Sequence, residues 1–249
     1  MRTIDNTKIE WCYVEWKQGQ PFASAFQDVY FSSDNGVLET EHVFLQGNDL
    51  SNRWQQLTTN TFTITETGFG SGLNFLCAAK LWLETAPKDT ILNFTSVEKY
   101  PLVLSDITTA LQLWPELTTL STPLLAQYAT LMNAKTISFY DNRVQLSLLI
   151  GDATEQLRHL HNKTDAWFLD GFSPAKNPNM WQPALFEQMA RLSHANTTFA
   201  TFTSAGMVRR GLISAGFKVI KRSGFGKKRE MITGHFAGNQ NVLGNNSGT

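Results

Sequence analysis

A glycine-rich stretch, Thr-Glu-Thr-Gly-Phe-Gly-Ser-Gly-Leu-Asn, covers residues 65–74. It lies between a β-branched run at 61–64 and an apolar, helix-like stretch at 73–83. Gly68, Gly70 and Gly72 permit backbone angles that other residues rarely adopt, and the start of the following helix presents N–H groups without intrahelical partners. The stretch predicts a loop that binds a nucleotide or, as the simpler alternative, a tight strand-to-helix turn.

The spacing of the glycines narrows the choice of ligand. A dinucleotide-binding fingerprint is G-x-G-x-x-G with an acidic residue roughly 20 positions later. Here the third glycine comes one position early and Leu73 follows it. G-x-G-x-G with Glu66 just before it suits S-adenosylmethionine, because the sulfonium and ammonium groups of that molecule are cations.

Three acidic residues stand at or just after the ends of predicted strands. Glu98 ends the strand expected at 91–98, Asp152 follows the strand at 144–150, and Asp170 ends the strand at 166–170. The carboxyl ends of parallel strands meet at one edge of a sheet, where such sheets bind ligands. We expect Glu98 to accept hydrogen bonds from ribose hydroxyls and Asp152 to hold an adenine amino group. Glu98 and Asp152 are alternatively helix-capping residues.

The stretch 167–181 contains Asp170, four aromatic residues and two prolines that stiffen a loop. Asp170 can accept a proton or a hydrogen bond from an amine nucleophile. Phe172 and Trp181 can stack on a base that is extruded for reaction. The alternative is a structural aspartate with two aromatic side chains in the core.

Basic residues are concentrated near the carboxyl end of the sequence. Net charge is zero, but residues 205–230 contain eight basic residues and one acidic residue. A local basic face on an otherwise acidic body can bind phosphates at one place. The alternative is a solvated, lysine-rich sheet edge.

Other classes of chemistry have little support. The sequence has no H-E-x-x-H, paired C-x-x-C or G-x-x-x-x-G-K-[ST] motif. His159 and His161 fit a polar helix end better than a metal site, so we predict no metal. Two cysteines give no disulfide framework, and no apolar run approaches the ~20 residues that span a bilayer. We therefore expect a soluble, cytoplasmic protein with no membrane association.

Strand-like and helix-like segments alternate from residue 61 onward, which predicts an α/β fold with a mainly parallel sheet. The predicted strands are 61–66, 91–98, 144–150, 166–170, 197–203, 217–221 and 229–235. The predicted helices are 73–83, 102–113, 153–161, 183–192 and 205–215. The last two strands are too close together for a parallel crossover, so they must form an antiparallel hairpin. This seven-stranded, Rossmann-like arrangement is typical of class I methyltransferases.

Three regions follow from this pattern. Residues 1–60 do not alternate in this way and predict a small N-terminal β-rich extension, packed on the sheet domain and able to cover the ligand. In it, Asp34, Asn35 and Gly36 form a hairpin-turn signal before a strand at Val37 and Leu38. Residues 61–236 form the predicted methyltransferase domain. Residues 237–249, rich in Gly and Asn, predict a flexible tail or linker.

Five motifs in a fixed order carry a resemblance to a known family. They are Phe-Leu-Gln-Gly-Asn-Asp-Leu at 44–50, the glycine loop at 66–76, the Asp-Gly-Phe stretch at 168–181, Ala-Thr-Phe-Thr-Ser-Ala-Gly-Met-Val-Arg-Arg at 200–210, and Gly-Phe-Gly-Lys-Lys-Arg-Glu-Met at 224–231. From Trp11 to Phe236 the chain resembles the methyltransferase domain of the bacterial tRNA 5-methylaminomethyl-2-thiouridine biosynthesis bifunctional proteins.

The resemblance implies S-adenosylmethionine-dependent methylation of the aminomethyl group on C5 of the wobble uridine, giving 5-methylaminomethyl-(2-thio)uridine. It implies Asp170 as the catalytic residue and contacts with the anticodon arm of tRNA. The longer relatives continue into a FAD-dependent oxidoreductase, so this chain is either free-standing or one domain of such a protein. The cofactor-binding residues that the resemblance implies are Gly68, Gly70, Gly72, Glu98, Asp152 and Asp170, and we also predict Glu66 and Asn74 to bind the cofactor. The residues that we predict to bind the tRNA are Phe172, Lys176, Trp181, Arg209, Arg210, Lys227, Lys228 and Arg229.

Two other functions use the same features. A methyl- or aminopropyltransferase that acts on a small-molecule amine would also place an aspartate beside the amine. A non-catalytic nucleotide-binding domain would bind the cofactor, or nothing, without turnover.

Overall fold

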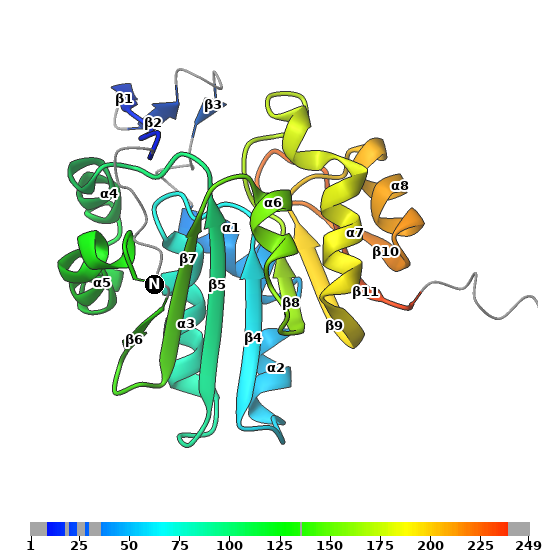
Figure 1. Ribbon diagram of the computed structural model, residues 1–249, viewed down its shortest axis with the longest axis horizontal. Coiled ribbons are helices and arrows are strands. Elements are labelled where there is room, and N and C mark those ends of the chain that lie inside the picture. The colour runs from blue at the N-terminus through cyan, green and yellow to red at the C-terminus, as the bar shows by residue number, and fades with distance from the viewer. Residues whose placement is uncertain (1–8, 18–19, 24–27, 30–35, 135, 239–249) are drawn as a thin grey trace, which may run out of the picture.

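A central eight-stranded sheet organises the protein, in the strand order β10-β11-β9-β8-β4-β5-β7-β6 (Figure 1). The computed structural model describes residues 9–17, 20–23, 28–29, 36–134 and 136–238. The strands are β4 (Thr61–Glu66), β5 (Ile91–Glu98), β6 (Ile137–Phe139), β7 (Val144–Ile150), β8 (Thr164–Phe168), β9 (Ser193–Thr201), β10 (Phe217–Ser223) and β11 (Glu230–Phe236).

The directions of the strands confirm the predicted fold class. β7, β5, β4, β8 and β9 pair in parallel, while β11 runs antiparallel between β9 and β10 and forms the expected hairpin with β10. The predicted number of seven strands is wrong by one, because β6 pairs antiparallel with β7 at the far edge. β6 has only three residues, too few for a period to be recognised in the sequence.

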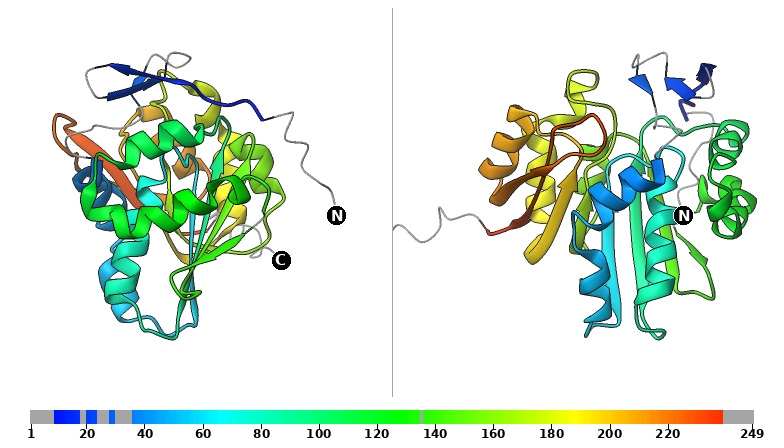
Figure 2. Two further views of the ribbon diagram at one scale, coloured as in Figure 1. Left: turned by 90° about the vertical axis from the view of Figure 1, so that its left-hand side faces the viewer. Right: turned by 180° about the vertical axis from the view of Figure 1, so that it is seen from behind.

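Helices cover both faces of this sheet (Figures 1 and 2). On one face lie α1 (Gly36–Thr40), α2 (Leu50–Gln55), α3 (Leu73–Thr85), α4 (Leu104–Leu111) and α5 (Thr118–Leu131), with the short 3-10 helix η3 (Pro115–Leu117). On the other lie α6 (Ala153–Arg158), α7 (Pro183–Arg191) and α8 (Gly206–Ser214), with the 3-10 helix η4 (Pro178–Trp181). Each face has its own buried apolar cluster, so the strands are buried on both sides.

The order of the strands fixes where a ligand can bind. From β4 the chain moves to β5 and β7 on one side, and then returns to β8 and β9 on the other. The carboxyl ends of β4 and β8 therefore flank a topological switch point, the place where open α/β sheets bind ligands. The glycine loop follows β4 and Asp170 follows β8, so the topology brings these two predicted features together.

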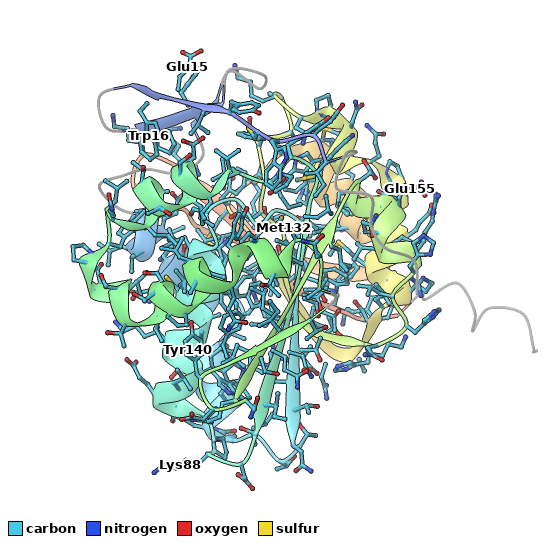
Figure 3. The ribbon with its side chains drawn as sticks, turned by 60° about the vertical axis from the view of Figure 1, so that its left-hand side comes forward. Glu15, Trp16, Lys88, Met132, Tyr140 and Glu155 are labelled. Atoms are coloured by element: carbon cyan, nitrogen blue, oxygen red, sulfur yellow. The ribbon has the colours of Figure 1, made fainter. Side chains whose placement is uncertain are left out.

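The N-terminal strands β1 (Val14–Lys17), β2 (Gln20–Ala23) and β3 (Asp28–Val29) form a separate antiparallel sheet. A hydrogen bond from Cys12 N to Pro101 O, 2.9 Å long, joins the segment before β1 to the loop after β5. Figure 3 shows Glu15 and Trp16 of this small sheet at the opposite end of the molecule from Lys88, which precedes β5. The small sheet thus lies at the carboxyl edge of the large one.

The segment from Gly36 to Gln55 consists of helices and one turn at 46–49, so the predicted strand at Val37 and Leu38 is wrong. α1 continues into a π-helix, η2 (Glu41–Leu45), and α2 follows. Apolar side chains of this segment, among them Phe44 and Trp54, are buried in the cluster that also contains α3, which favours helices over strands here. Asp34 and Asn35 of the predicted turn and residues 239–249 of the predicted tail lie outside the described residues. Among the described helices, none is long and apolar enough to cross a bilayer.

Candidate functional site

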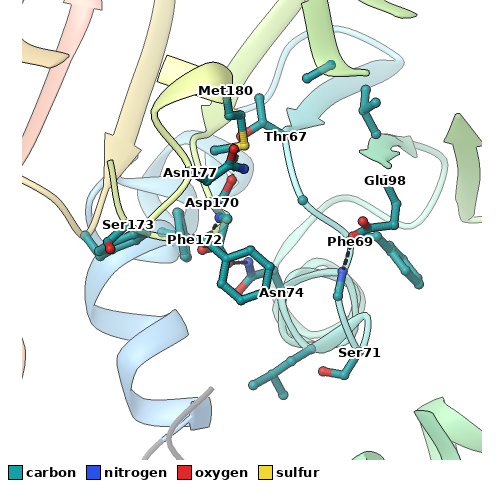
Figure 4. Close-up of a pocket in the computed structure, with 18 of the residues that line it drawn as sticks. Thr67, Phe69, Ser71, Asn74, Glu98, Asp170, Phe172, Ser173, Asn177 and Met180 are labelled. Carbon is teal, nitrogen blue, oxygen red and sulfur yellow. Dashed lines mark hydrogen bonds between the residues drawn. The ribbon is translucent and has the colours of Figure 1, made fainter. Parts of the chain in front are cut away.

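A cavity of about 840 Å³ opens at the carboxyl edge of the large sheet. Its walls come from the glycine loop, the ends of β5 and β7, the loop after β8, the α1–η2 segment and the loop between β10 and β11. Figure 4 shows the part of this cavity around Asp170 and the glycine loop. The volume is within the range of ligand and cofactor sites in proteins.

The glycines are required by the shape of the loop. Gly70 and Gly72 have φ angles of 52° and 77°, and Gly72 stands immediately before the first residue of α3. A side chain at Gly68 would come within 3.3 Å of the Asp170 carbonyl oxygen. The loop is therefore a tight strand-to-helix turn, which was the simpler of the two predictions, and Gly68 and Gly70 also line the cavity.

Glu98 lies at the end of β5 with its carboxylate held by the backbone. Oε2 accepts a hydrogen bond from Gly70 N at 3.0 Å, and Oε1 accepts one from Tyr100 N at 2.8 Å. Burial raises the pKa of Glu98, and these backbone donors oppose the rise by stabilising the anion. Each carboxylate oxygen can accept a second hydrogen bond, so the geometry is compatible with the predicted contacts to ribose hydroxyls.

Asp152 caps a helix and also reaches the cavity, so its position is compatible with both predicted roles. Its Oδ1 accepts a hydrogen bond from Thr154 N at 3.0 Å, which caps α6. Its Oδ2 lies 3.7 Å from Lys99 Nζ, and the residue lines the cavity. The N-cap is thus confirmed, and the contact with adenine stays a prediction.

Asp170 lies at the cavity wall, half-buried, with both carboxylate oxygens engaged. Oδ1 accepts a hydrogen bond from Gly171 N at 2.7 Å, and Oδ2 accepts one from Asn74 Nδ2 at 2.7 Å. Burial raises the pKa of Asp170 to about 6, and the two hydrogen bonds act in the opposite direction. A carboxylate with this pKa is a suitable proton acceptor near neutral pH.

Glu66 does not line the cavity, so the expectation that it touches the cofactor is wrong. Its side chain is fully buried and accepts hydrogen bonds from Asn74 Nδ2 at 2.8 Å and Ser96 Oγ at 2.6 Å. Burial raises the pKa of Glu66 to about 8. Thr40 Oγ1 donates to Asn74 Oδ1 at 2.7 Å, so the Asn74 amide is fixed between Thr40 and the two carboxylates.

The aromatic residues of the loop after β8 separate into two roles. Phe172 lines the cavity, as predicted for a residue that stacks on a base. Trp181 is only 1% exposed and packs against Phe202 in the core, so the prediction that it contacts a base is wrong. Trp181 Nε1 instead donates to Phe172 O at 3.0 Å and so supports the cavity wall. Lys176 is exposed on the same loop and lies outside the cavity lining.

The predicted basic residues occupy two surface elements. Arg209 and Arg210 are exposed on α8, and Arg229 is exposed before β11. Lys227 and Lys228 belong to the loop between β10 and β11 and line the cavity. Lys228 Nζ is already engaged, 2.7 Å from Glu39 Oε1 and 4.3 Å from the centre of the Phe202 ring. Lys228 therefore has a partner within the chain that the sequence did not reveal.

Several lining residues were not predicted as site residues. Glu39, Thr40 and Phe44 come from the α1–η2 segment, which was expected to be β-rich. Phe44 stacks on Phe168 at the end of β8, with ring centroids 5.1 Å apart. The sequence motif at 44–50 was the one feature that could have indicated a role for this segment in the site. Asn177 and Met180 also line the cavity and lie within the stretch that was recognised around Asp170.

The side chains of the cavity fit S-adenosylmethionine. Glu98, Asp152 and Asp170 present carboxylates to the cavity, which are suitable acceptors for hydroxyl, amino and cationic groups, and the glycine loop allows close approach to the main chain. Glu98 and Asp152 lie at the ends of the neighbouring strands β5 and β7, so the two residues stand on the same side of the switch point.

Comparisons with known proteins agree with this arrangement. A family model described as S-adenosyl-L-methionine-dependent methyltransferase matches residues 115–237. The chain is 54% identical over 228 residues to the tRNA 5-methylaminomethyl-2-thiouridine biosynthesis bifunctional protein MnmC of Methylobacillus flagellatus, covering 91% of this chain and 35% of that protein. It is 52% identical over 240 residues to the protein of the same name from Pseudomonas paraeruginosa, covering 96% of this chain and 36% of that protein.

The chain thus spans about a third of the length of the curated relatives that it matches. A crystal structure of MnmC2 from Aquifex aeolicus shares the fold, with a TM-score of 0.70 and 20% sequence identity, over 93% of this chain and 72% of that one. These likenesses confirm the predicted resemblance and the predicted cofactor. Residues 115–237 thus match a family of S-adenosyl-L-methionine-dependent methyltransferases, and the chain is similar, over nearly its whole length, to about a third of these bifunctional proteins.

Proposed function

We propose that this chain methylates the amine of 5-aminomethyl-(2-thio)uridine at the wobble position of tRNA and so forms 5-methylaminomethyl-(2-thio)uridine. The names of the curated relatives support the product, and the family supports the methyl donor. Residues 61–236 would form the catalytic domain, with the α1–η2 segment as part of its wall. Because the relatives are longer and bifunctional, we also propose that an FAD-dependent oxidoreductase domain prepares the amine in a longer cytoplasmic protein.

The methyl donor would lie between the glycine loop and the ends of β5 and β7. When bound, S-adenosylmethionine supplies an electrophilic methyl group on its sulfonium sulfur. Glu98 would accept hydrogen bonds from the ribose, Asp152 from the adenine amino group, and Asp170 would face the reacting end. All three carboxylates line the cavity, which supports this division of roles.

The acceptor amine must lose a proton before or during transfer, because only the neutral amine has a free electron pair. A carboxylate nearby stabilises an ammonium ion and raises its pKa, which by itself opposes reaction. We propose that Asp170 orients the amine and takes its proton, while the apolar wall at Phe172 disfavours the charged form of the amine. The raised pKa of Asp170, about 6, brings its basicity closer to that of the amine.

The tRNA would contact the exposed basic residues around the cavity mouth. Arg209, Arg210, Lys227 and Arg229 are exposed, and Lys227 lines the cavity itself. Phosphates of the anticodon arm would bind these side chains, and Lys176 lies exposed on the loop beside the acceptor. Lys228 would contact a phosphate only by leaving Glu39.

The observation that carries this proposal is the placement of Asp170, held by Asn74 and Gly171 on the cavity wall beside the glycine loop. The test is incubation of the protein with methyl-labelled S-adenosylmethionine and tRNA that lacks the final methyl group, followed by nucleoside analysis. We expect label in 5-methylaminomethyl-(2-thio)uridine. Label that appears only in a free polyamine, or in no acceptor, would overturn the proposal.

A further inference from the structure

The loop after β8 carries a side-chain amide at the acceptor end of the cavity. Asn177 is half-buried, lines the cavity, and lies between Met180 and Asp170 in Figure 4. Glu98 lies on the other side of the glycine loop in the same view. With the methyl donor on the side of Glu98, the space beside Asn177 belongs to the acceptor.

The backbone around Asn177 is firmly held. Asn177 N donates to Ser173 O at 2.9 Å, and Met180 N donates to Asn177 O at 3.3 Å. Pro178 follows directly and fixes the start of η4, while Trp181 supports the wall through Phe172 O. The position of Asn177 is therefore preorganised before any acceptor binds.

The side chain of Asn177 has no hydrogen-bond partner within the described part of the chain. This is unusual for its place, because Asn177 stands immediately before a helix, where asparagine normally caps the first turn with its side chain. Here the side chain makes no such cap. The amide oxygen and nitrogen of Asn177 are therefore available to a ligand in the cavity.

The chemistry of the amide matches one edge of a pyrimidine. An asparagine side chain presents one acceptor oxygen beside a donor NH₂ group. The imide edge of uracil presents a donor, N3–H, beside an acceptor, the C4 carbonyl oxygen. Two parallel hydrogen bonds can therefore form, as in other proteins that bind an extruded base by its Watson–Crick edge.

We propose that the Asn177 amide binds the N3–H and the C4 carbonyl of the acceptor uracil, an inference that rests on the proposed function. This contact would select the base that presents its C5 substituent to Asp170. Phe172 and Met180 line the cavity beside it and supply apolar surface for the faces of the ring. Asn177 is thus a specificity-determining residue of the acceptor site.

The test uses two anticodon stem-loop oligonucleotides, one with 5-aminomethyluridine and one with its N3-methyl derivative at the wobble position. For the wild-type protein, N3-methylation removes the donor and should lower kcat/KM by about 10- to 100-fold. Asn177→Ala should lower kcat/KM on the first oligonucleotide by a similar factor. N3-methylation should then cost the variant little, because the two changes remove the same interaction.

Asn177→Asp serves as a second variant of nearly the same size, since it keeps an acceptor for N3–H but cannot donate to the C4 carbonyl. It should also lose activity with wild-type affinity for the methyl donor. Asn60→Ala, at an exposed position before β4, is the matched control and should behave as wild type. Unchanged kcat/KM for both Asn177 variants, or the same cost of N3-methylation in wild type and Asn177→Ala, would overturn the assignment. A wild-type protein that methylates neither oligonucleotide nor tRNA would overturn the proposed function, and the role of Asn177 with it.

Discussion

Asn74 and Asp170 are joined by a 2.7 Å hydrogen bond, from the Asn74 side-chain amide to the carboxylate that faces the cavity. The same amide nitrogen donates to the buried Glu66, and Thr40 holds the amide oxygen. Both amide hydrogens and the oxygen are thus engaged, so the amide cannot flip without losing contacts. Asn74 therefore ties the first turn of α3 to the proposed reaction centre at the end of β8.

Asn74→Ala should lower kcat by about 10- to 100-fold, because Asp170 loses the contact that orients it. The change also leaves Glu66 and Thr40 with unfilled hydrogen-bonding capacity and should cost about 1–3 kcal/mol in the free energy of unfolding. Steady-state kinetics and chemical denaturation measure the two effects. Asn133→Ala, an exposed asparagine beyond the end of α5, is the control. Wild-type kcat in Asn74→Ala would show that Asp170 needs no such support.

Activity should fall at acid pH as Asp170 becomes protonated. Its pKa is raised to about 6, so kcat/KM for the acceptor should decline below about pH 6 rather than near the ordinary carboxyl range. Measurements of kcat/KM between pH 5 and 8 would show this decline on the acid side. The residual activity of Asp170→Ala should lack it. If the same decline persists in Asp170→Ala, the titration belongs to another group.

Glu66 should make the folded protein less stable as pH rises. Burial raises its folded-state pKa to about 8, whereas the pKa in an unfolded chain is about 4.3. The folded state therefore holds the proton more tightly, and this stabilisation is lost between those two values. The free energy of unfolding should decrease by up to ~1.4 kcal/mol per pH unit in this window for one proton.

Glu66→Gln tests this pH dependence because the amide keeps an acceptor for Asn74 and removes the titration. Its free energy of unfolding should vary less between pH 6 and 8 than that of the wild type. Glu187→Gln, on the exposed side of α7, should keep the wild-type slope. Equal slopes for wild type and Glu66→Gln would contradict the raised pKa.

Much of the sheet could be predicted from the sequence. The bounds of β4, β5 and β7 agree with the prediction, because apolar and β-branched runs ended by turn residues are local signals. α5 could not be recognised, since its residues include many Thr and a proline, Pro123, inside the helix. Tertiary packing against α3 and α4 stabilises it instead.

The site was predictable only in part. The carboxylates at strand ends followed from topology, because parallel strands deliver their last residues to one edge. The burial of the Glu66 and Trp181 side chains could not be predicted, because local sequence does not tell whether a side chain points into a cavity or into the core. The wall formed by α1 and η2 depends on contacts across the chain, such as Lys228 with Glu39, which no local pattern encodes.

Methyl-donor affinity should depend on Glu98. Glu98→Ala removes the acceptor that the backbone of Gly70 and Tyr100 holds in place, and we expect the affinity for S-adenosylmethionine to fall by about 10- to 100-fold. Calorimetry measures this change. Glu187→Ala is the matched control. Undiminished donor affinity in Glu98→Ala would exclude the proposed ribose contact.

Charge reversal at the cavity mouth should weaken tRNA binding. Lys227→Glu combined with Arg229→Glu removes two exposed cations, so the affinity should fall and the slope of log affinity against log salt should decrease by about one for each lost phosphate contact. Binding titrations at several salt concentrations measure both quantities. Lys88→Glu, at the opposite end of the molecule from the N-terminal sheet, is the control (Figure 3). Equal salt slopes for the double variant and the control would place the tRNA elsewhere.

The role of Asp170 can be measured most directly by single-turnover methyl transfer to unmethylated tRNA, with donor affinity determined in the same preparations. Wild-type protein should transfer the methyl group, and Asp170→Ala should transfer it roughly 10²–10⁴ times more slowly with nearly unchanged affinity for S-adenosylmethionine. Transfer by Asp170→Ala at the wild-type rate, or no donor binding by the wild-type protein, would contradict a reaction centre at the end of β8.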